Sequence, residues 1–218
     1  MVIRQAAICV AFGLLTSSAS FAAGAPFTME QVLNYPYASE MAAARNGGHI
    51  AWVRNVAGVR NVWVADAPTF KPHQVTQYKD DDGQEITQLT FSPDGKSLVY
   101  VRGGDHDANW PAEGNIAPVP NASTDQQKVT ILSARLRGGA PTKIAEGDES
   151  AISATGKLAF VVGDQVWTAP LSGKGKAELL FFDRGKDHQL QWSPDGKSLA
   201  FVSQRGDHSF ITVFTDKT

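Results

Sequence analysis

The chain has 218 residues, and its 20 Lys and Arg against 22 Asp and Glu give a formal net charge of −2 at pH 7. This near-neutral balance argues against a nucleic-acid partner held by a basic surface. No segment after the first 25 residues approaches the roughly 20 apolar residues that a membrane span needs. Length allows one or two domains, and the composition favours a soluble, β-rich protein.

The N-terminus has the pattern of a secretory signal peptide. Arg4 supplies a positive charge, residues 6–15 form a short apolar core, and Ser20-Phe21-Ala22 is a small-x-small cleavage site. We therefore predict a cleavable signal at residues 1–22, cut after Ala22, and a periplasmic or secreted protein; an uncleaved membrane anchor is the alternative. The only cysteine, Cys9, lies inside this segment, so the mature chain would have no disulfide and no thiolate chemistry.

A short extension follows at residues 23–38. Thr28 can cap a helix over residues 29–33. Pro36 then favours extended geometry in the residue before it. The remaining residues, 39–218, are predicted to form one β-domain.

Nearly the same eleven residues occur twice, as Phe91–Val101 and Trp192–Val202. Each copy contains Ser-Pro-Asp-Gly-Lys, in which proline presets the φ of a type I turn and glycine closes it. A short apolar run rich in β-formers follows, as expected for a strand covered on both faces. Each copy therefore predicts a strand end, a tight turn and a buried strand.

Residues 46–53 and 153–161 are degenerate copies that keep the glycine and the apolar strand. The copies recur at spacings of 48, 60 and 41 residues. A four-stranded propeller blade takes roughly 40–50 residues, and one insertion, at residues 103–127, accounts for the long spacing. A second strand follows in each unit, at residues 61–65, 128–132, 165–169 and 209–214. The pattern predicts an all-β fold: a partial β-propeller with WD40-like repeats and about three and a half four-stranded blades.

The repeats resemble the N-terminal β-propeller of bacterial exported S9 serine peptidases (the prolyl oligopeptidase family) of the dipeptidyl or acylaminoacyl-peptidase kind. The residues that carry the resemblance are Gly58–Ala65 and Val101–Asn115, which includes Arg-Gly-Gly-Asp at 102–105. The resemblance implies a propeller that precedes an α/β-hydrolase domain and admits only short or unstructured peptides to its Ser-His-Asp active site. No cofactor is implied.

The chain itself lacks the Gly-x-Ser-x-Gly elbow in which such a nucleophile sits. The serines of the repeat turns have no flanking glycines at both required positions; they are Ser92, Ser153, Ser172 and Ser193. No catalytic residue is therefore assigned, and we expect the chain to end before the hydrolase domain. Two alternatives stay open: a non-enzymatic, TolB-like periplasmic propeller that binds protein partners and, with less support, a sugar-active or lyase propeller.

The candidate substrate-binding residues are Asp105, His106, Asp107 and Glu113, in an insertion that spans residues 103–127. Two carboxylates beside an imidazole could bind a metal or the N-terminal amine of a peptide, although a solvated insertion is favoured and no metal site is assigned. Long insertions in a tight repeat are often functional. Glu113 stands alone, without the adjacent glutamate pair of related dipeptidyl peptidases, so dipeptidyl specificity is not supported.

The remaining polar and aromatic clusters favour structural roles. Residues 80–83 and 183–188 are predicted to be solvated turns between blades, because the first lacks the ligand pattern of an EF-hand. The five histidines show no metal spacing and are predicted to be structural or at the surface. Four tryptophans are predicted to lie in the cores between blades; they are Trp52, Trp63, Trp167 and Trp192.

Overall fold

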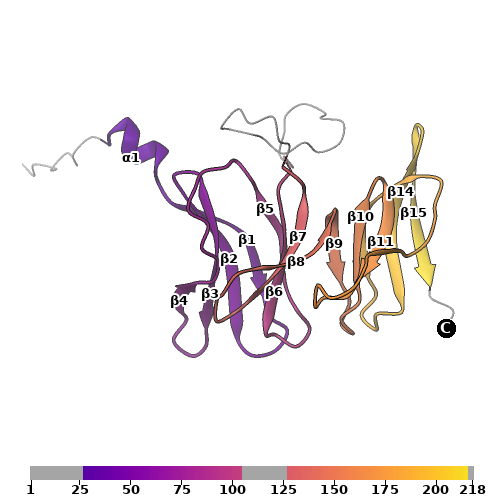
Figure 1. Cartoon of the computed structure of the whole chain (residues 1–218), viewed down its shortest axis with the longest axis horizontal. Helices are drawn as coiled ribbons and strands as arrows, with labels where there is room; N and C mark the ends of the chain where they lie inside the picture. The colour runs from indigo at the N-terminus through magenta and orange to yellow at the C-terminus, as the bar shows by residue number, and fades with distance from the viewer. Residues whose placement is uncertain (1–26, 105–126, 216–218) are drawn as a thin grey trace, which may run out of the picture.

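A computed structural model describes residues 27–104 and 127–215 of the chain. These residues form four antiparallel sheets that stand side by side in chain order (Figure 1). The inner strands of successive sheets contact one another, which gives the arrangement of propeller blades around a common side. The predicted all-β, propeller-like fold is therefore confirmed, with three four-stranded blades and one three-stranded blade. Among the described residues, no helix is long and apolar enough to cross a membrane.

The blades are strictly sequential. Blade 1 contains β1 (Tyr37–Ala43), β2 (His49–Val56), β3 (Val59–Asp66) and β4 (Lys71–Gln74). Blade 2 contains β5 (Ile86–Phe91), β6 (Ser97–Arg102), β7 (Thr130–Arg135) and β8 (Thr142–Glu146). Blade 3 contains β9 (Asp148–Ile152), β10 (Leu158–Val162), β11 (Gln165–Ala169) and β12 (Glu178–Leu179). Blade 4 contains β13 (Lys186–Trp192), β14 (Ser198–Arg205) and β15 (His208–Thr215).

The repeated turn folds as predicted. In blade 2, the Ser92 hydroxyl donates to Asp94 Oδ1 over 2.6 Å, and the Lys96 N–H donates to the same oxygen over 3.1 Å. The second copy repeats both bonds at 2.5 Å and 3.0 Å, with Asp195 as the acceptor. Glycine closes each turn in the left-handed region, with φ of 66° at Gly95 and 70° at Gly196. The aspartates are therefore turn residues, as the sequence indicated.

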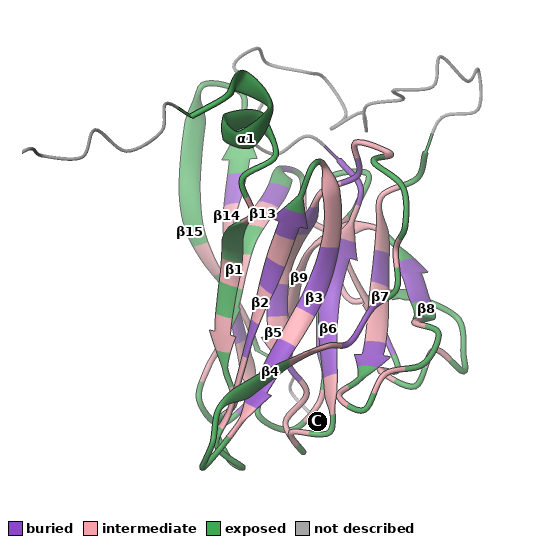
Figure 2. Cartoon of the chain, turned by 90° about the vertical axis from the view of Figure 1, so that its left-hand side faces the viewer, coloured by how far each residue is buried: buried purple, intermediate pink, exposed green. Residues whose placement is uncertain are grey.

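Blades pack face to face through apolar side chains. The largest cluster joins blades 1 and 2 and includes Val53, Val62, Leu98 and Tyr100, each at most 1% exposed. A second cluster joins blades 2 and 3, and a smaller one joins blades 3 and 4 around Leu199. Figure 2 shows buried residues on the middle strands of blades 1 and 2. Burial of this apolar area is the main source of stability.

Every inner strand has a β-bulge at the same position. Two of its residues oppose a single residue of the next strand, and the first of the two has a positive φ of 51° to 57°. The four bulge residues are Glu40, Gln88, Glu149 and Gln189. Positive φ is uncommon outside glycine, so its recurrence at one position of all four blades marks a built feature of the repeat.

The bulges link successive blades. Glu40 Oε2 accepts from the Leu89 N–H over 3.3 Å, so a side chain of blade 1 binds the bulge of blade 2. Gln88 Oε1 accepts from the Ser150 N–H, and Glu149 Oε2 accepts from the Gln189 N–H. The bulge side chains of blades 1, 2 and 3 thus each bind the backbone of the following blade. We call this series of contacts the bulge relay.

The N-terminal helix α1 (Met29–Leu33) has the predicted bounds and cap. The Thr28 hydroxyl accepts from the Gln31 N–H, and the Gln31 side chain accepts from the Thr28 N–H, which completes a capping box. The helix buries no residue and stands apart from the sheets (Figure 1). Large apolar side chains next to it in the chain are exposed, including Phe27 at 85% and Tyr35 at 75%.

The predicted tryptophan core is confirmed for two of the four residues, and the other two lie on a face that no described blade covers. Trp167 and Trp192 pack against the second and third clusters, and Trp192 Nε1 donates to the Ala151 carbonyl over 3.2 Å. Trp52 and Trp63 instead pair with each other across β2 and β3. They alternate with the core residues of these strands, so they lie on the face of blade 1 that turns away from blade 2.

Candidate functional site

The four predicted substrate-binding residues lie outside the described residues. Asp105, His106, Asp107 and Glu113 belong to the segment between β6 and β7, and the structure gives no test of their role. The predicted signal peptide is likewise outside the described range. Within residues 27–104 and 127–215, no group of three or more His, Cys, Asp or Glu side chains could hold a metal ion.

A cavity of about 820 Å³ lies between blades 1 and 2. Its lining residues lie at or near the β1–β2, β3–β4, β5–β6 and β7–β8 turns, and these turns are at the end of the sheets opposite α1 (Figure 1). We call this cavity the inter-blade cavity. Its walls carry two histidines, two aspartates and three cationic side chains, from positions that are far apart in sequence: His49, Asp66, His73, Asp94, Lys96, Arg135 and Arg137.

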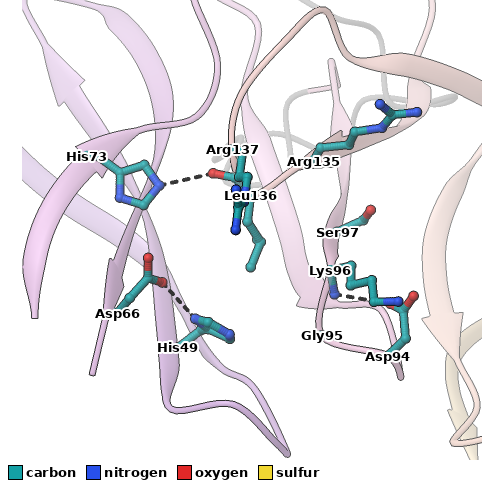
Figure 3. A pocket seen from close by; sticks show the side chains of 10 residues that line it. All are labelled: His49, Asp66, His73, Asp94, Gly95, Lys96, Ser97, Arg135, Leu136 and Arg137. Atoms are coloured by element: carbon teal, nitrogen blue, oxygen red, sulfur yellow. Dashed lines mark hydrogen bonds and ion pairs between the residues drawn. The ribbon is translucent and has the colours of Figure 1, made fainter. Parts of the chain in front are cut away.

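Blade 1 contributes a histidine–carboxylate pair to this cavity. His49 begins β2 and Asp66 ends β3, and the two are register partners. His49 Nδ1 lies 2.7 Å from Asp66 Oδ1 (Figure 3), so Nδ1 is the donor and Nε2 is the nitrogen left for other contacts. The imidazole also stacks on Phe91 of blade 2, with ring centroids 6.3 Å apart. These contacts hold the imidazole in the wall between the blades.

A second histidine joins the blades directly. His73 Nε2 lies 3.0 Å from the carbonyl oxygen of Leu136, 63 residues along the chain. Because a carbonyl only accepts, His73 Nε2 donates this bond. The bond anchors the segment that follows β7 and therefore fixes the backbone from which Arg135 and Arg137 project. His49 and His73 thus have structural roles, as predicted, but the cavity that they line was not foreseen.

The cations of the cavity have no ion-pair partner among the described residues. Lys96, Arg135 and Arg137 are all exposed, and Figure 3 places them across the cavity from His49 and Asp66. The two carboxylates are already engaged, Asp66 with His49 and Asp94 with the repeat turn. The hydrogen bonds from Ser92 and from the Lys96 N–H lower the pKa of Asp94. The unengaged charge in this cavity is therefore positive.

A different cluster lies at the start of blade 4, where a solvated turn was predicted. That prediction is wrong for residues 186–188, which belong to β13, and for Asp187, which is 2% exposed. Burial and the negative charge of Asp183 raise the pKa of Asp187 to about 6. Both of its carboxylate oxygens are buried without a hydrogen-bond partner, which is costly for an ionised carboxylate.

Asp183 has the opposite environment. It accepts hydrogen bonds from the Ser203 hydroxyl and from Arg205. Although desolvation opposes the shift, these contacts and the N–H groups of Arg184 and Gly185 lower the pKa of Asp183 to about 2. The linker before blade 2 is similar, because Asp82 binds Arg102 and Asp81 lies 3.8 Å from Arg60. The predicted solvated turns are thus partly ion-paired: Asp82 and Asp183 each bind an arginine in the second strand of the blade that follows, and Asp81 lies near Arg60 of the preceding blade.

Comparison with known proteins supports the fold. No protein-family model matches the chain. A curated protein, the putative tricorn protease homolog 2 of Streptomyces coelicolor, is 43% identical over 49 residues, which are 22% of this chain and 4% of that protein. This stretch is too short to assign the chain to a family.

Solved structures align with most of the chain. TolB from Acinetobacter baumannii aligns over 82% of this chain and 41% of its own, with a TM-score of 0.56 and 19% identity. A prolyl endopeptidase aligns over 85% of this chain and 29% of its own, with a TM-score of 0.58 and 13% identity. A puromycin-hydrolyzing peptidase of Mycobacterium tuberculosis aligns over 84% and 28%, with a TM-score of 0.57 and 18% identity. The chain thus has a propeller fold and spans less than half of each of these proteins.

Proposed function

We propose that this chain is the substrate-gating propeller portion of an exported S9-family serine peptidase that acts on short peptides. The observation that carries the proposal is the alignment of more than four fifths of the chain with the two peptidases. The local identity to a tricorn protease homolog and the resemblance at residues 101–115 point the same way. A propeller that stands over an active site limits entry by the width of its openings, so it selects substrates by size.

The alternative is a non-enzymatic propeller that binds protein partners. Two TolB structures support it, because they also align over 82% of the chain. The reading frame beyond the codon for Thr218 separates the two functions. An α/β-hydrolase domain with a Gly-x-Ser-x-Gly elbow would support the peptidase. Further blades alone would overturn it and favour the TolB-like function.

The chain alone is expected to hydrolyse nothing, because no serine of its repeat turns has the required flanking glycines. The test is hydrolysis of chromogenic dipeptide and acyl-amino-acid substrates by the purified chain. A full-length protein that contains the hydrolase domain is the positive control. Activity of the chain alone that a fluorophosphonate blocks would contradict the proposal.

Export is part of the same proposal and has its own test. The signal-like residues 1–22 predict a mature protein that begins at Ala23. Mass spectrometry of the protein from a periplasmic extract would give this N-terminus directly. Retention of Met1 in a membrane fraction would instead support an uncleaved anchor.

A further inference from the structure

A second cavity adjoins the inter-blade cavity and lies between blades 2 and 3. Its volume is about 500 Å³. Arg135 and Ser97 line both cavities. These two residues are register partners, with Ser97 at the start of β6 and Arg135 at the end of β7, so they lie at the same end of blade 2. The two cavities thus share part of their lining, and we call them together the basal groove, with Arg135 in the wall of both.

The wall that blade 3 adds is also cationic. Lys174 follows the turn at Ser172 and Gly173. That turn lies tightly against β8, because a Cβ atom on Gly173 would come within 2.7 Å of the Lys143 carbonyl oxygen. Gly173 has a φ of 66°, a conformation that glycine adopts without strain. The turn thus fixes the backbone from which Lys174 extends into the groove.

The polar groups of the second cavity suit an anion. Its lining residues include no carboxylate, and hydroxyl groups accompany Arg135 and Lys174: Ser97, Ser133, Thr142 and Ser172. The lining of the whole basal groove contains four cationic side chains and two histidines but only two carboxylates. Both carboxylates already accept hydrogen bonds from neighbouring groups. This local excess of positive charge lies on a chain whose net charge is negative.

We propose that the basal groove binds a small polyanion through phosphate or carboxylate groups. Arginine guanidinium groups bind both kinds of oxyanion with two parallel hydrogen bonds, and lysine adds a point charge. Arg135 and Arg137 are exposed and have no ion pair among the described residues, so a ligand would not have to displace a carboxylate from them. The extent of the groove across two blade junctions fits a ligand with several charged groups. The inference does not depend on the peptidase proposal.

The test is isothermal titration of the full chain at low salt with two probes, tripolyphosphate and citrate. The double variant R135A/R137A should weaken binding of the preferred probe about tenfold or more, because it removes two charge-assisted contacts. The matched control is K79A/R184A, which removes the same charge from two exposed side chains outside the groove. It should change the dissociation constant by less than about twofold, and binding by the unchanged chain should weaken as salt rises.

The outcomes are distinct. Tighter binding of tripolyphosphate would identify a phosphate-bearing ligand, and tighter binding of citrate a carboxylate-bearing one. An equal loss in the two double variants would overturn the proposal, as would the absence of binding of both probes by the unchanged chain. Far-ultraviolet circular dichroism checks the fold of each variant. If R135A/R137A does not fold, K174A provides the test, because it changes a single side chain in an exposed turn.

Discussion

Blades 2 and 4 contain the two near-identical copies of the repeat, and they differ in the inner strand just before each copy begins. Each residue of the second copy follows its counterpart by 101 positions, so Asp94 matches Asp195 and Leu98 matches Leu199. The turns have the same hydrogen bonds in both blades. At the start of the inner strand, however, buried Ile86 of blade 2 is matched by buried Asp187 of blade 4.

This comparison separates features that depend on nearby residues in the sequence from features that depend on the neighbouring blade. The turn is fixed by residues within a few positions of one another, and it is therefore the same in both copies. The environment of the strands depends on the neighbouring blade. Blade 2 is packed on both sides, whereas blade 4 packs on blade 3 through the smallest of the three clusters. Paired substitutions at matching positions measure this difference.

The largest effect is expected for Leu98→Ala. Leu98 is fully buried in the largest cluster, and truncation of such a side chain costs about 2–5 kcal/mol. Leu199→Ala should fall near the lower end of that range, because fewer buried side chains surround Leu199. Urea denaturation gives both free energies of unfolding. An equal or larger loss of stability for Leu199→Ala would show that the size of an apolar cluster does not predict how much it stabilises the contact between its two blades.

The next largest effect is expected for Asp187→Asn, which should raise the free energy of unfolding in a pH-dependent way. The pKa of Asp187 is raised in the folded state to about 6 from the usual 3.8, so the folded chain binds this proton more tightly than the unfolded chain. The wild-type protein therefore loses stability as pH rises between these two values. A neutral amide avoids that loss, so Asp187→Asn should be the more stable protein at pH 8, by up to about 3 kcal/mol.

The free energy of unfolding at pH 4 and pH 8 is the measurement. The gain should nearly vanish at pH 4, where Asp187 is protonated. Asp80→Asn, in an exposed linker, is the control and should show no gain at either pH. A similar loss for Asp187→Asn at both pH values would contradict the buried-charge explanation.

A smaller effect is expected in the bulge relay. Gln88 accepts from the Ser150 N–H and donates to Asp148 over 2.9 Å. Gln88→Ala removes both contacts and should cost about 1–3 kcal/mol. Gln189→Ala is the matched control, with the same bulge and a similar φ but an exposed side chain, and it should cost less than about 0.5 kcal/mol. Equal losses in urea denaturation would mean that backbone strain, rather than the relay, is being measured.

The smallest effect is expected in the turns. Asp94→Ala and Asp195→Ala each remove the same two hydrogen bonds from an exposed carboxylate. Both variants should show a slight and equal fall in melting temperature by differential scanning calorimetry. A clear difference between them would show that the turn, too, depends on its blade.

Sequence reasoning succeeded where the determinants are local. The capped helix at Met29–Leu33 and the Ser-Pro-Asp-Gly turns follow from residues within five positions of one another. It failed where remote segments meet. His73 contacts Leu136 across 63 positions, and no spacing in the sequence indicates that pairing or the cavity around it. Asp187 appeared to be solvated because its neighbours are charged, although the alternation of β13 turns it inward.

The tryptophan prediction did not specify which face of a blade each side chain would occupy. Trp52 and Trp63 have the strand positions of core residues, but the alternation of β2 and β3 directs them away from blade 2. Apolar character predicts that a side chain will be covered, but not which face it will occupy. A signal was available, because Ala51 and Val53 are small residues that alternate with Trp52, and only one of the two sets can face the next blade.

The contacts of the bulge relay all have the same order along the chain. In each of the three contacts, the acceptor side chain belongs to the earlier blade and the N–H donor to the later one. During synthesis the earlier blade also emerges first. When each new inner strand forms, the side chain that accepts its N–H hydrogen bond is therefore already present in the preceding blade. The order of translation and the order of these contacts coincide, so the relay can guide blade-by-blade assembly from the N-terminus.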